Sequence, residues 1–223
     1  RVTTILIADD HPLFRDALRG AVGRALPQAR IVEAADVAAM FAMIESEGEA
    51  DLLLMDLNMP GAQGFSALVQ VRAAHPQLPV VVVSAREEAG VVQRALAHGA
   101  SGFIPKSADA ATIATALRTV LDGERWSPVP ARPSVLASDE ADIAHRVAEL
   151  TPQQFRVLGM LARGLLNKQI AYDLGVSEAT IKAHMTAILR KLGANNRTQA
   201  VLLAGKLALD PNEVDASAVV EEG

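Results

Sequence analysis

The chain has 223 residues, 50% of them hydrophobic, and its 21 Lys or Arg against 26 Asp or Glu give a net charge of −5. This length allows two compact domains, and the mixture of apolar and charged residues indicates a globular chain. There is no apolar run of membrane-spanning length, no secretory leader and no cysteine for a disulfide or a thiolate metal site, so we expect a cytoplasmic protein without a membrane partner.

The first half of the sequence alternates between two hydrophobic periods. Short apolar runs lie at 4–8, 31–32, 52–55, 80–83 and 103–104, and stretches with helical spacing lie at 12–25, 37–46, 65–74, 87–97 and 110–121. Continuous apolar strands separated by helices predict a parallel sheet that is covered on both faces. We therefore predict an α/β domain with a five-stranded, doubly wound sheet.

Polar residues stand where four of these strands end. They are Asp9 and Asp10, Asp56, Ser84 and Lys106. The carboxyl ends of parallel strands form the functional crevice where the strand order reverses, so the order 2-1-3-4-5 would bring three carboxylates together. Any one of these residues alone would more often be a turn-forming, capping or solvated side chain. The prediction of a shared site depends on their joint arrangement.

Three clustered carboxylates repel one another, so a proton or a cation must lie among them. Oxygen ligands favour Mg2+ over zinc or copper. A metal, a lysine and a hydroxyl around one aspartate are the groups that stabilise a phosphoryl group in transfer. Asp56 is then the predicted nucleophile, which takes the phosphoryl group as an acyl phosphate.

The segments LIADDHPL, LLLMDLNMPGAQGF, VVVVSA and ASGFIPKS resemble the receiver domain of bacterial response regulators, over residues 3 to about 122. The resemblance implies a flavodoxin-like domain with Asp56 as phosphoacceptor. The implied Mg2+ ligands are Asp9 (mainly through water), Asp10, Asp56 and the backbone carbonyl of Asn58. The implied phosphoryl contacts are Ser84 and Lys106, and the implied switch residues are Ser84 and Phe103. The alternative for Phe103, which the resemblance disfavours, is an ordinary core aromatic at a strand end.

A proline-rich stretch separates this domain from the rest of the chain. Residues 123–147 contain Pro128, Pro130 and Pro133, which disfavour both helix and strand, so we predict a semi-rigid linker in which 139–147 could form a short helix. The predicted organisation is a receiver at 1–122, a second domain at 148–209 and an acidic, disordered tail at 210–223.

The second domain carries the positive charge of the chain. Residues 149–209 contain eight Lys or Arg and three Asp or Glu, which suggests a polyanionic partner. Thr151, Pro152 and Gln154 form a capping-box pattern at the start of a helix that ends at Gly164. A short helix over NKQIAYDL leads to a turn at Gly175, and the next helix runs from the cap Ser177 to Gly193. This pattern predicts a helix-turn-helix.

The last of these helices has two distinct faces. Its predicted core face is Ile181, Met185, Ile188, Leu189 and Leu192. Its opposite face is Ala179, Ala183, Thr186 and Arg190, flanked by Lys182 and Lys191. Small residues allow close approach to a DNA groove, while Lys and Arg contact phosphates or bases. This helix alone would be equally compatible with an ordinary solvated amphipathic helix.

Residues 150 to about 208 resemble the LuxR-type DNA-binding domain, a small four-helix domain whose final helix, here near 197–207, pairs across a dimer. The resemblance implies that Lys182, Ala183 and Thr186 face base edges. It places Asn167, Lys168, Thr180 and Lys191 near the phosphates. Gln154 and Leu166 depart from the usual Glu and small polar residue, and the capping argument predicts that Gln154 preserves the fold.

Both resemblances together imply a two-component response regulator of the NarL/FixJ type. A sensor histidine kinase would phosphorylate Asp56, and the modified protein would form a homodimer and bind specific sequences of double-stranded DNA to regulate transcription. We also hypothesise that the unmodified receiver masks the DNA-binding or dimer helix. No enzymatic role is expected beyond self-phosphorylation from small donors and self-dephosphorylation.

Two alternatives remain open from the sequence. A phosphatase resembling the haloacid dehalogenases would use similar groups, but it needs a general acid two residues after the nucleophile, where this chain has Asn58. The other alternative is a DNA-binding transcription factor that works without phosphorylation and uses its receiver only as a scaffold.

Overall fold

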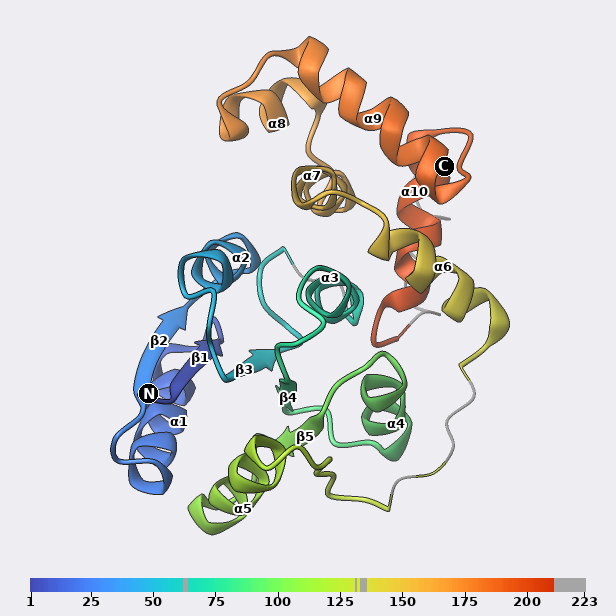
Figure 1. The fold of residues 1–223 in the computed structure, drawn as a ribbon. Coiled ribbons are helices and arrows are strands. Elements are labelled where there is room, and N and C mark those ends of the chain that lie inside the picture. The colour runs from blue at the N-terminus through green and yellow to red at the C-terminus, as the bar shows by residue number, and fades with distance from the viewer. Residues whose placement is uncertain (62–63, 131, 133–135, 211–223) are drawn as a thin grey trace. The chain divides into compact units, whose positions relative to one another are not determined.

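The computed structural model describes residues 1–61, 64–130, 132 and 136–210. It divides into two compact units, Arg1–Ala62 with Ala74–Leu136, and Gln63–Ala73 with Ala137–Gly223. Figure 1 follows the helices and strands along the chain. The predicted acidic tail, apart from Asp210, lies outside the described residues.

The first unit contains a parallel sheet of five strands. They are β1 (Thr4–Ala8), β2 (Arg30–Ala34), β3 (Leu52–Asp56), β4 (Val80–Ser84) and β5 (Gly102–Pro105). Their order is β2-β1-β3-β4-β5, the order that the sequence argument required. β2 is longer than the predicted run at 31–32 because Arg30, Glu33 and Ala34 also pair with β1, from Thr4 opposite Arg30 to Ala8 opposite Ala34.

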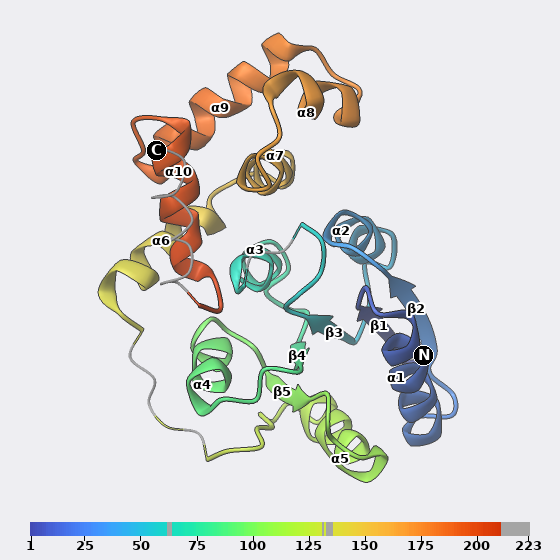
Figure 2. The same cartoon turned by 180° about the vertical axis from the view of Figure 1, so that it is seen from behind.

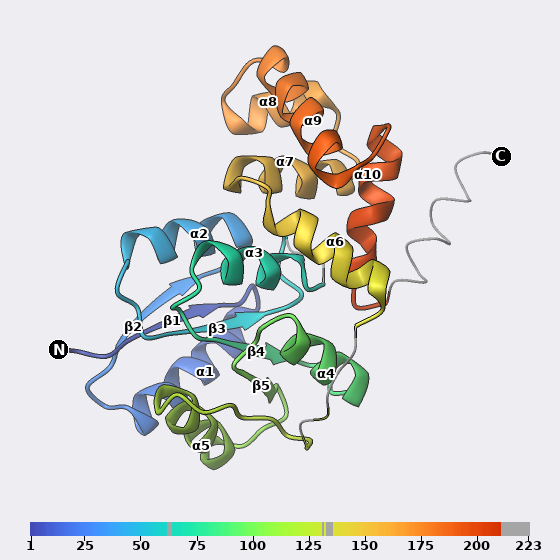
Figure 3. The same ribbon diagram turned by 45° about the vertical axis from the view of Figure 1, so that its right-hand side comes forward.

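Helices cover both faces of this sheet, as predicted for a doubly wound fold. α1 (Pro12–Ala25) and α5 (Ala110–Leu121) pack on one face, where Leu18 and Leu117 join Ile7 and Leu54 in one hydrophobic core. α2 (Val37–Ser46) and α4 (Ala89–Ala97) lie on the opposite face (Figure 3). α3 (Ser66–Ala74) falls almost entirely within the second unit.

Two segments of the first unit differ from expectation. α4 begins at Ala89 rather than at 87, because the residues after β4 form a loop in which the Arg86 N–H donates to Ser84 Oγ at 3.0 Å. The predicted linker is not a free tether from its first residue, because the Phe103 N–H donates to the Trp126 carbonyl at 3.2 Å. Trp126 therefore belongs structurally to the edge of the sheet at β5.

The second unit is helical. Besides α3 it contains α6 (Ser138–Ala148), α7 (Pro152–Ala162), α8 (Asn167–Leu174), α9 (Glu178–Leu192), α10 (Arg197–Ala204) and the short 3-10 turn η1 (Gly205–Leu207), which Figure 2 shows from behind. The short helix considered within 139–147 is thus confirmed as α6. Arg146 of α6 donates to the Leu192 carbonyl at 2.8 Å, which ties α6 to the end of α9.

Local signals at the helix ends behave as the sequence predicts. The Gln154 N–H donates to Thr151 Oγ1 at 3.2 Å, and the Thr151 N–H donates to Gln154 Oε1 at 3.1 Å, which completes the capping box of α7. Gly175, with φ of 66°, provides the left-handed residue at the turn between α8 and α9. Among the described residues, no helix is long and apolar enough to cross a membrane.

Candidate functional site

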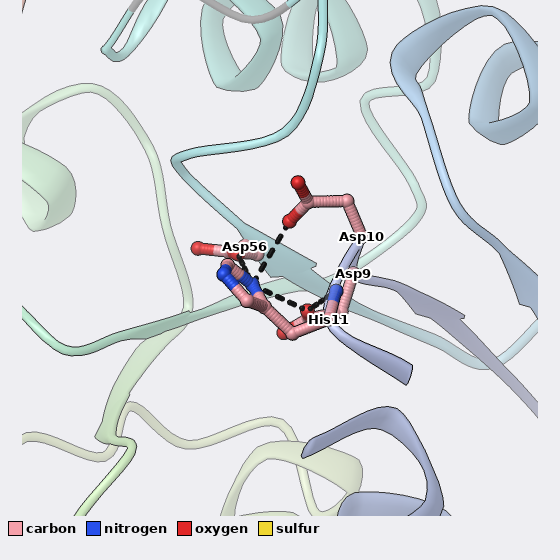
Figure 4. A group of neighbouring side chains, drawn as sticks. All are labelled: Asp9, Asp10, His11 and Asp56. Carbon is pink, nitrogen blue, oxygen red and sulfur yellow. Dashed lines mark hydrogen bonds and ion pairs between the residues drawn. The ribbon is translucent and has the colours of Figure 1, made fainter. Parts of the chain in front are cut away.

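The ends of β1 and β3 bring three carboxylates together; we call Asp9, Asp10 and Asp56 the acid cluster. Ala8 pairs with Met55 across the two strands, so the residues that follow them emerge side by side. Asp9 and Asp56 are only 1% and 2% exposed. Ligand atoms of the three acids and of His11 all lie within 4.8 Å of one another (Figure 4). The strand order therefore assembles the predicted site.

Lys106, which follows β5, supplies a positive charge to the acid cluster. Its Nζ lies 2.9 Å from Asp9 Oδ2 and 3.0 Å from Asp56 Oδ2. Burial alone would lower the pKa of this ammonium, but the hydrogen bonds and negative charges of Asp9 and Asp56 together outweigh burial and raise the pKa above its ordinary value. Lys106 is therefore a permanent cation at neutral pH, and its Nζ also lies 4.5 Å from the ring centre of Phe14.

Ser84 and Phe103 lie on the two neighbouring strands at this end of the sheet. Ser84 is the last residue of β4, and its carbonyl accepts the Lys106 N–H at 2.8 Å. Phe103 pairs with Val82 across β4 and β5, and both Ser84 and Phe103 are fully buried. The hydroxyl and the lysine are thus held on adjacent strand ends, with the aromatic ring inside the first unit.

Asn58 contacts the acid cluster through its backbone. Its N–H donates to Asp56 Oδ1 at 3.1 Å, while its side chain is exposed. This hydrogen bond orients the Asp56 carboxylate from the side opposite to Lys106, which contacts Oδ2. The role of the Asn58 carbonyl as a metal ligand stays a prediction.

The residue that sequence reasoning missed is His11. Its Nδ1 lies 2.9 Å from Asp10 Oδ1, 3.3 Å from Asp9 Oδ1 and 3.7 Å from Asp56 Oδ2 (Figure 4). The only signal in the sequence was its position directly after the acid pair, in DDH. Strand β1 ends at Ala8, so the alternation of side chains along a strand does not determine where the His11 side chain points.

The acid cluster is chemically suited to a divalent cation. Carboxylate oxygens are the donors that Mg2+ prefers, and here three of them converge beside the positive charge of Lys106. One lysine cannot neutralise three carboxylates, so a cation of charge two would complete the balance of charge. The donor set therefore fits the magnesium that the sequence predicted.

The predicted DNA-reading helix is α9. Ile181, Ile188 and Leu192 are fully buried, whereas Met185 and Leu189 are half-buried at the border of the core face. The opposite face is exposed at Ala179, Ala183, Thr186 and Arg190, and so is the flanking Lys182. The two faces thus lie where the helical spacing placed them.

The residues expected near phosphates have different surroundings. Lys168 is exposed on α8, Asn167 is half-buried at its first position, and the Thr180 N–H donates to the cap Ser177 at 3.1 Å. Lys191 is engaged within the unit, because its Nζ donates to Gln154 Oε1 at 2.8 Å and to the Glu149 carbonyl at 3.1 Å. Its cationic end links α9 to the start of α7.

The two departures from the family pattern are accommodated locally. Gln154 Oε1 accepts hydrogen bonds from both Thr151 and Lys191, so an amide oxygen serves where a carboxylate is usual. Leu166 is 62% exposed, and its backbone N–H donates to Gln169 Oε1 at 2.8 Å. The start of α8 is therefore capped by Gln169 rather than by the side chain at 166.

Comparisons with known proteins agree with these two sites. Residues 5–118 match the response regulator receiver domain, and residues 148–204 match the bacterial regulatory proteins of the luxR family. The glycerol metabolism activator of Pseudomonas putida is 40% identical over 214 residues, which are 91% of this chain and 95% of that protein. The nitrate/nitrite response regulator NarL of Escherichia coli K12 is 32% identical over 202 residues, with 89% and 93% covered.

A solved structure supports the fold of both units. RcsB from Salmonella enterica serovar Typhimurium, bound to a promoter in the presence of the phosphomimetic BeF3−, superposes with a TM-score of 0.54 at 22% identity, over 93% of this chain and 100% of that one. The two family matches and the similar relatives show that the chain belongs to the transcriptional response regulators that join a receiver domain to a LuxR-type DNA-binding domain.

Proposed function

We propose that this transcriptional response regulator is switched by a phosphoryl group carried on Asp56, which a sensor histidine kinase supplies. The observation that carries the proposal is the position of Asp56, whose buried carboxylate lies 3.0 Å from the Lys106 ammonium and within the acid cluster. A buried carboxylate beside a fixed cation and a potential metal site is placed to attack phosphorus rather than to form a solvent-exposed ion pair.

In the proposed transfer, one Asp56 oxygen forms a bond to phosphorus while the bond from phosphorus to the donor's leaving atom breaks. Lys106 holds positive charge beside the reacting carboxylate, and the Asn58 N–H fixes the orientation of that carboxylate. Ser84 and Lys106 contact the phosphoryl oxygens of the product. Bound Mg2+, held by Asp9, Asp10, Asp56 and the Asn58 carbonyl, would neutralise charge on the transferring group.

The phosphoryl group adds about 1.5 to 2 negative charges at neutral pH, in a place where two carboxylates are already buried. Ser84 moves toward the new oxygens, and the neighbouring Phe103 occupies the space that it leaves. Because both side chains are fully buried, such a movement changes packing at the ends of β4 and β5. The phosphoryl group increases the population of the dimer-forming state. The size of this increase is set by the difference between its stabilisation of that state and of the unmodified conformation.

The output is recognition of double-stranded DNA by α9. Its exposed face brings Ala183 and Thr186 against base edges, with Lys182 and Arg190 available for bases or phosphates. Asn167, Lys168 and Thr180 contact phosphates at the start of the two helices, and Lys191 joins them if it leaves Gln154. A homodimer formed through α10 would present two such faces.

We further propose that the chain has no substrate turnover beyond accepting phosphoryl groups from small donors and hydrolysing its own acyl phosphate. A haloacid-dehalogenase-like phosphatase would need an acid at Asn58, which here offers a backbone N–H to Asp56 and an exposed amide. The proposed location is the cytoplasm, because a bacterial response regulator reaches both its DNA and the catalytic domain of its kinase there.

The proposal is tested by intact mass spectrometry after incubation with Mg2+ and a small phosphodonor, with DNA affinity measured on the same samples. Wild type should gain one phosphoryl group and change its affinity, and Asp56→Asn should do neither. Asp16→Asn, the same change on the exposed face of α1, is the matched control and should behave as wild type. If wild type gains no mass and binds DNA equally well throughout, the scaffold alternative is the better account.

A further inference from the structure

We propose that His11 is a nitrogen ligand of the receiver's metal site, which makes that site selective for divalent cations that accept imidazole, with Mn2+ and Ni2+ as test cases. The inference rests on the proposed function, because it concerns the cation that the acid cluster holds. A ring nitrogen of His11 belongs to the set of ligand atoms that lie within 4.8 Å of one another.

The distances around His11 suit a shared octahedral ion. With metal–ligand bonds of about 2.1 Å, neighbouring ligand atoms are roughly 3.0 Å apart and opposite ones roughly 4.2 Å apart. His11 Nδ1 lies 2.9 Å from Asp10 Oδ1, 3.3 Å from Asp9 Oδ1 and 3.7 Å from Asp56 Oδ2. All three separations fall at or between these two values, so the imidazole nitrogen lies close enough to the acid cluster to bind the same ion, directly beside Asp10 and Asp56 and with Asp9 reached through water.

The backbone that carries the imidazole is fixed by local contacts. The His11 N–H donates to Asp9 Oδ1 at 2.7 Å, and the His11 carbonyl accepts the Arg15 N–H at 2.9 Å in the first turn of α1. Pro12 restricts the preceding residue to extended conformations, and His11 has φ of −91° and ψ of 104°. The Arg15 guanidinium donates to the Asp9 carbonyl at 2.7 Å and closes the same turn. The His11 backbone is therefore fixed beside Asp9, and the imidazole projects from it to within 2.9 Å of Asp10 Oδ1.

An imidazole changes which metal the site prefers. Mg2+ takes hard oxygen ligands and keeps several waters, so the acid cluster serves it with or without a histidine. Mn2+, Ni2+ and Zn2+ accept nitrogen, and their affinity for nitrogen-containing sites rises from Mn2+ to Ni2+. His11 should therefore contribute more to Ni2+ and Mn2+ affinity than to Mg2+ affinity.

The primary test is pulsed electron paramagnetic resonance of Mn2+ bound to the full-length protein. Wild type should show coupling from a directly bound 14N nucleus, which changes to the 15N pattern after labelling with 15N-histidine. His11→Ala and His11→Gln should lose this coupling, and His145→Ala, which removes a 78% exposed histidine on α6, should retain it. A wild-type spectrum without nitrogen coupling would overturn the proposal, whatever the variants do.

Calorimetric titration with each metal ion gives the second test. His11→Ala should bind Ni2+ at least about tenfold more weakly than wild type, while its Mg2+ affinity changes by a smaller factor. An equal loss of affinity for both metals would mean that His11 only supports the carboxylates, and would contradict its role as a selective ligand. Thermal unfolding of each metal-free variant separates loss of a ligand from loss of the fold.

The two proposals fail in different ways. If wild type takes up a phosphoryl group with Mg2+ but its Mn2+ spectrum lacks nitrogen coupling, the inference about His11 is wrong and the proposed function stands. If nitrogen coupling is present but no phosphoryl group is taken up on Asp56, the metal assignment stands and the proposed switch is wrong.

Discussion

The acid cluster and the exposed face of α9 hold charged groups in opposite ways. In the acid cluster, two carboxylates are almost completely buried, and Lys106, fifty residues after Asp56, lies 3.0 Å from it. On α9, Lys182 and Arg190 are exposed and belong to one continuous helix of 15 residues. The acid cluster therefore exists only when several strand ends meet, whereas the exposed face of α9 needs only the helix itself.

This difference determines how each region responds to substitution. A buried charge depends on its partners, because removal of one partner leaves the other charged in a medium of low dielectric. An exposed charge is solvated with or without neighbours, so its removal changes binding and leaves folding nearly unaffected. Changes in the acid cluster should therefore disturb stability and chemistry together, and changes on the α9 face should disturb DNA binding alone.

The largest expected effect is that of Lys106→Met, which leaves Asp9 and Asp56 buried without their cation. We expect a loss of about 3–5 kcal/mol in the free energy of unfolding of the first unit. Urea denaturation followed by the fluorescence of Trp126, the only tryptophan, reports on that unit. Mg2+ should stabilise the variant more than wild type, because the ion replaces the missing positive charge.

Lys206→Met is the matched control, since it removes a lysine whose partner, Asp139, is exposed. It should leave the unfolding of the first unit unchanged. If Lys106→Met costs no more than this control, the buried acid cluster would depend on its cation no more than an exposed ion pair does.

Ile188→Ala tests the buried side of α9. Ile188 is fully buried, so its truncation leaves a cavity and should cost about 3 kcal/mol in the unfolding of the second unit. Urea denaturation followed by far-ultraviolet circular dichroism measures this loss, and Ile188→Val should cost about 1 kcal/mol. Equal stability of the alanine variant and wild type would contradict the assignment of this face to the core.

Lys182→Ala tests the exposed side of the same helix. The fold should keep its stability, while DNA affinity falls about tenfold, which corresponds to about 1.4 kcal/mol. Fluorescence anisotropy with a DNA site selected by the protein and with unrelated DNA measures both affinities. A larger loss on the selected site indicates contact with a base edge, and equal losses would assign Lys182 to a phosphate instead.

Ser177→Ala tests the start of α9, where Ser177 Oγ accepts the Thr180 N–H at 3.1 Å. Loss of this cap should cost about 1 kcal/mol in the unfolding of the second unit. Chemical denaturation of Ser177→Ala and Ser177→Asp measures the effect, and the aspartate should restore stability because its carboxylate also caps the helix. Equal loss in both variants would mean that the serine acts by some means other than capping.

The smallest expected effect concerns the ion pair of Asp139 and Lys206 within the second unit. The hydrogen bond from Lys206 is the main cause that lowers the pKa of the Asp139 carboxyl. A carboxyl whose pKa is lowered on folding stabilises the fold above its ordinary pKa of 3.8, and this contribution disappears as the pH falls through the lowered value. Carbon-13 nuclear magnetic resonance of the carboxyl should show a lower pKa in wild type than in Lys206→Met, and identical values would exclude the pairing.

Much of this molecule could be predicted from local patterns. The apolar runs located all five strands, and the alternation of strands with helical stretches indicated a doubly wound sheet. The capping pattern at Thr151 and Gln154 predicted both hydrogen bonds that start α7, because such bonds join residues three apart. The buried and exposed faces of α9 followed from a period of 3.6 residues in the same way.

Other features were beyond the sequence because they depend on residues far apart in the chain. The family resemblance placed Lys191 near phosphates, but its ammonium contacts Gln154 and the Glu149 carbonyl, which lie 37 and 42 residues earlier in the chain. The late start of α4 depends on the loop before it, in which the Arg86 N–H donates to Ser84 Oγ. The sequence of this loop contains no helix-breaking residue that would have predicted the late start.

The sequence by itself determined the identities of the strands and helices, their caps and the residue types available at each strand end, because those depend on neighbours a few positions away. Tertiary structure decided which of those strand ends meet, and with that the distance from Lys106 to Asp56 and the turn of His11 toward the acid cluster. The physical reason is that buried charges are positioned by partners from neighbouring strands. The periodicity along one strand does not say which other strands will be its neighbours.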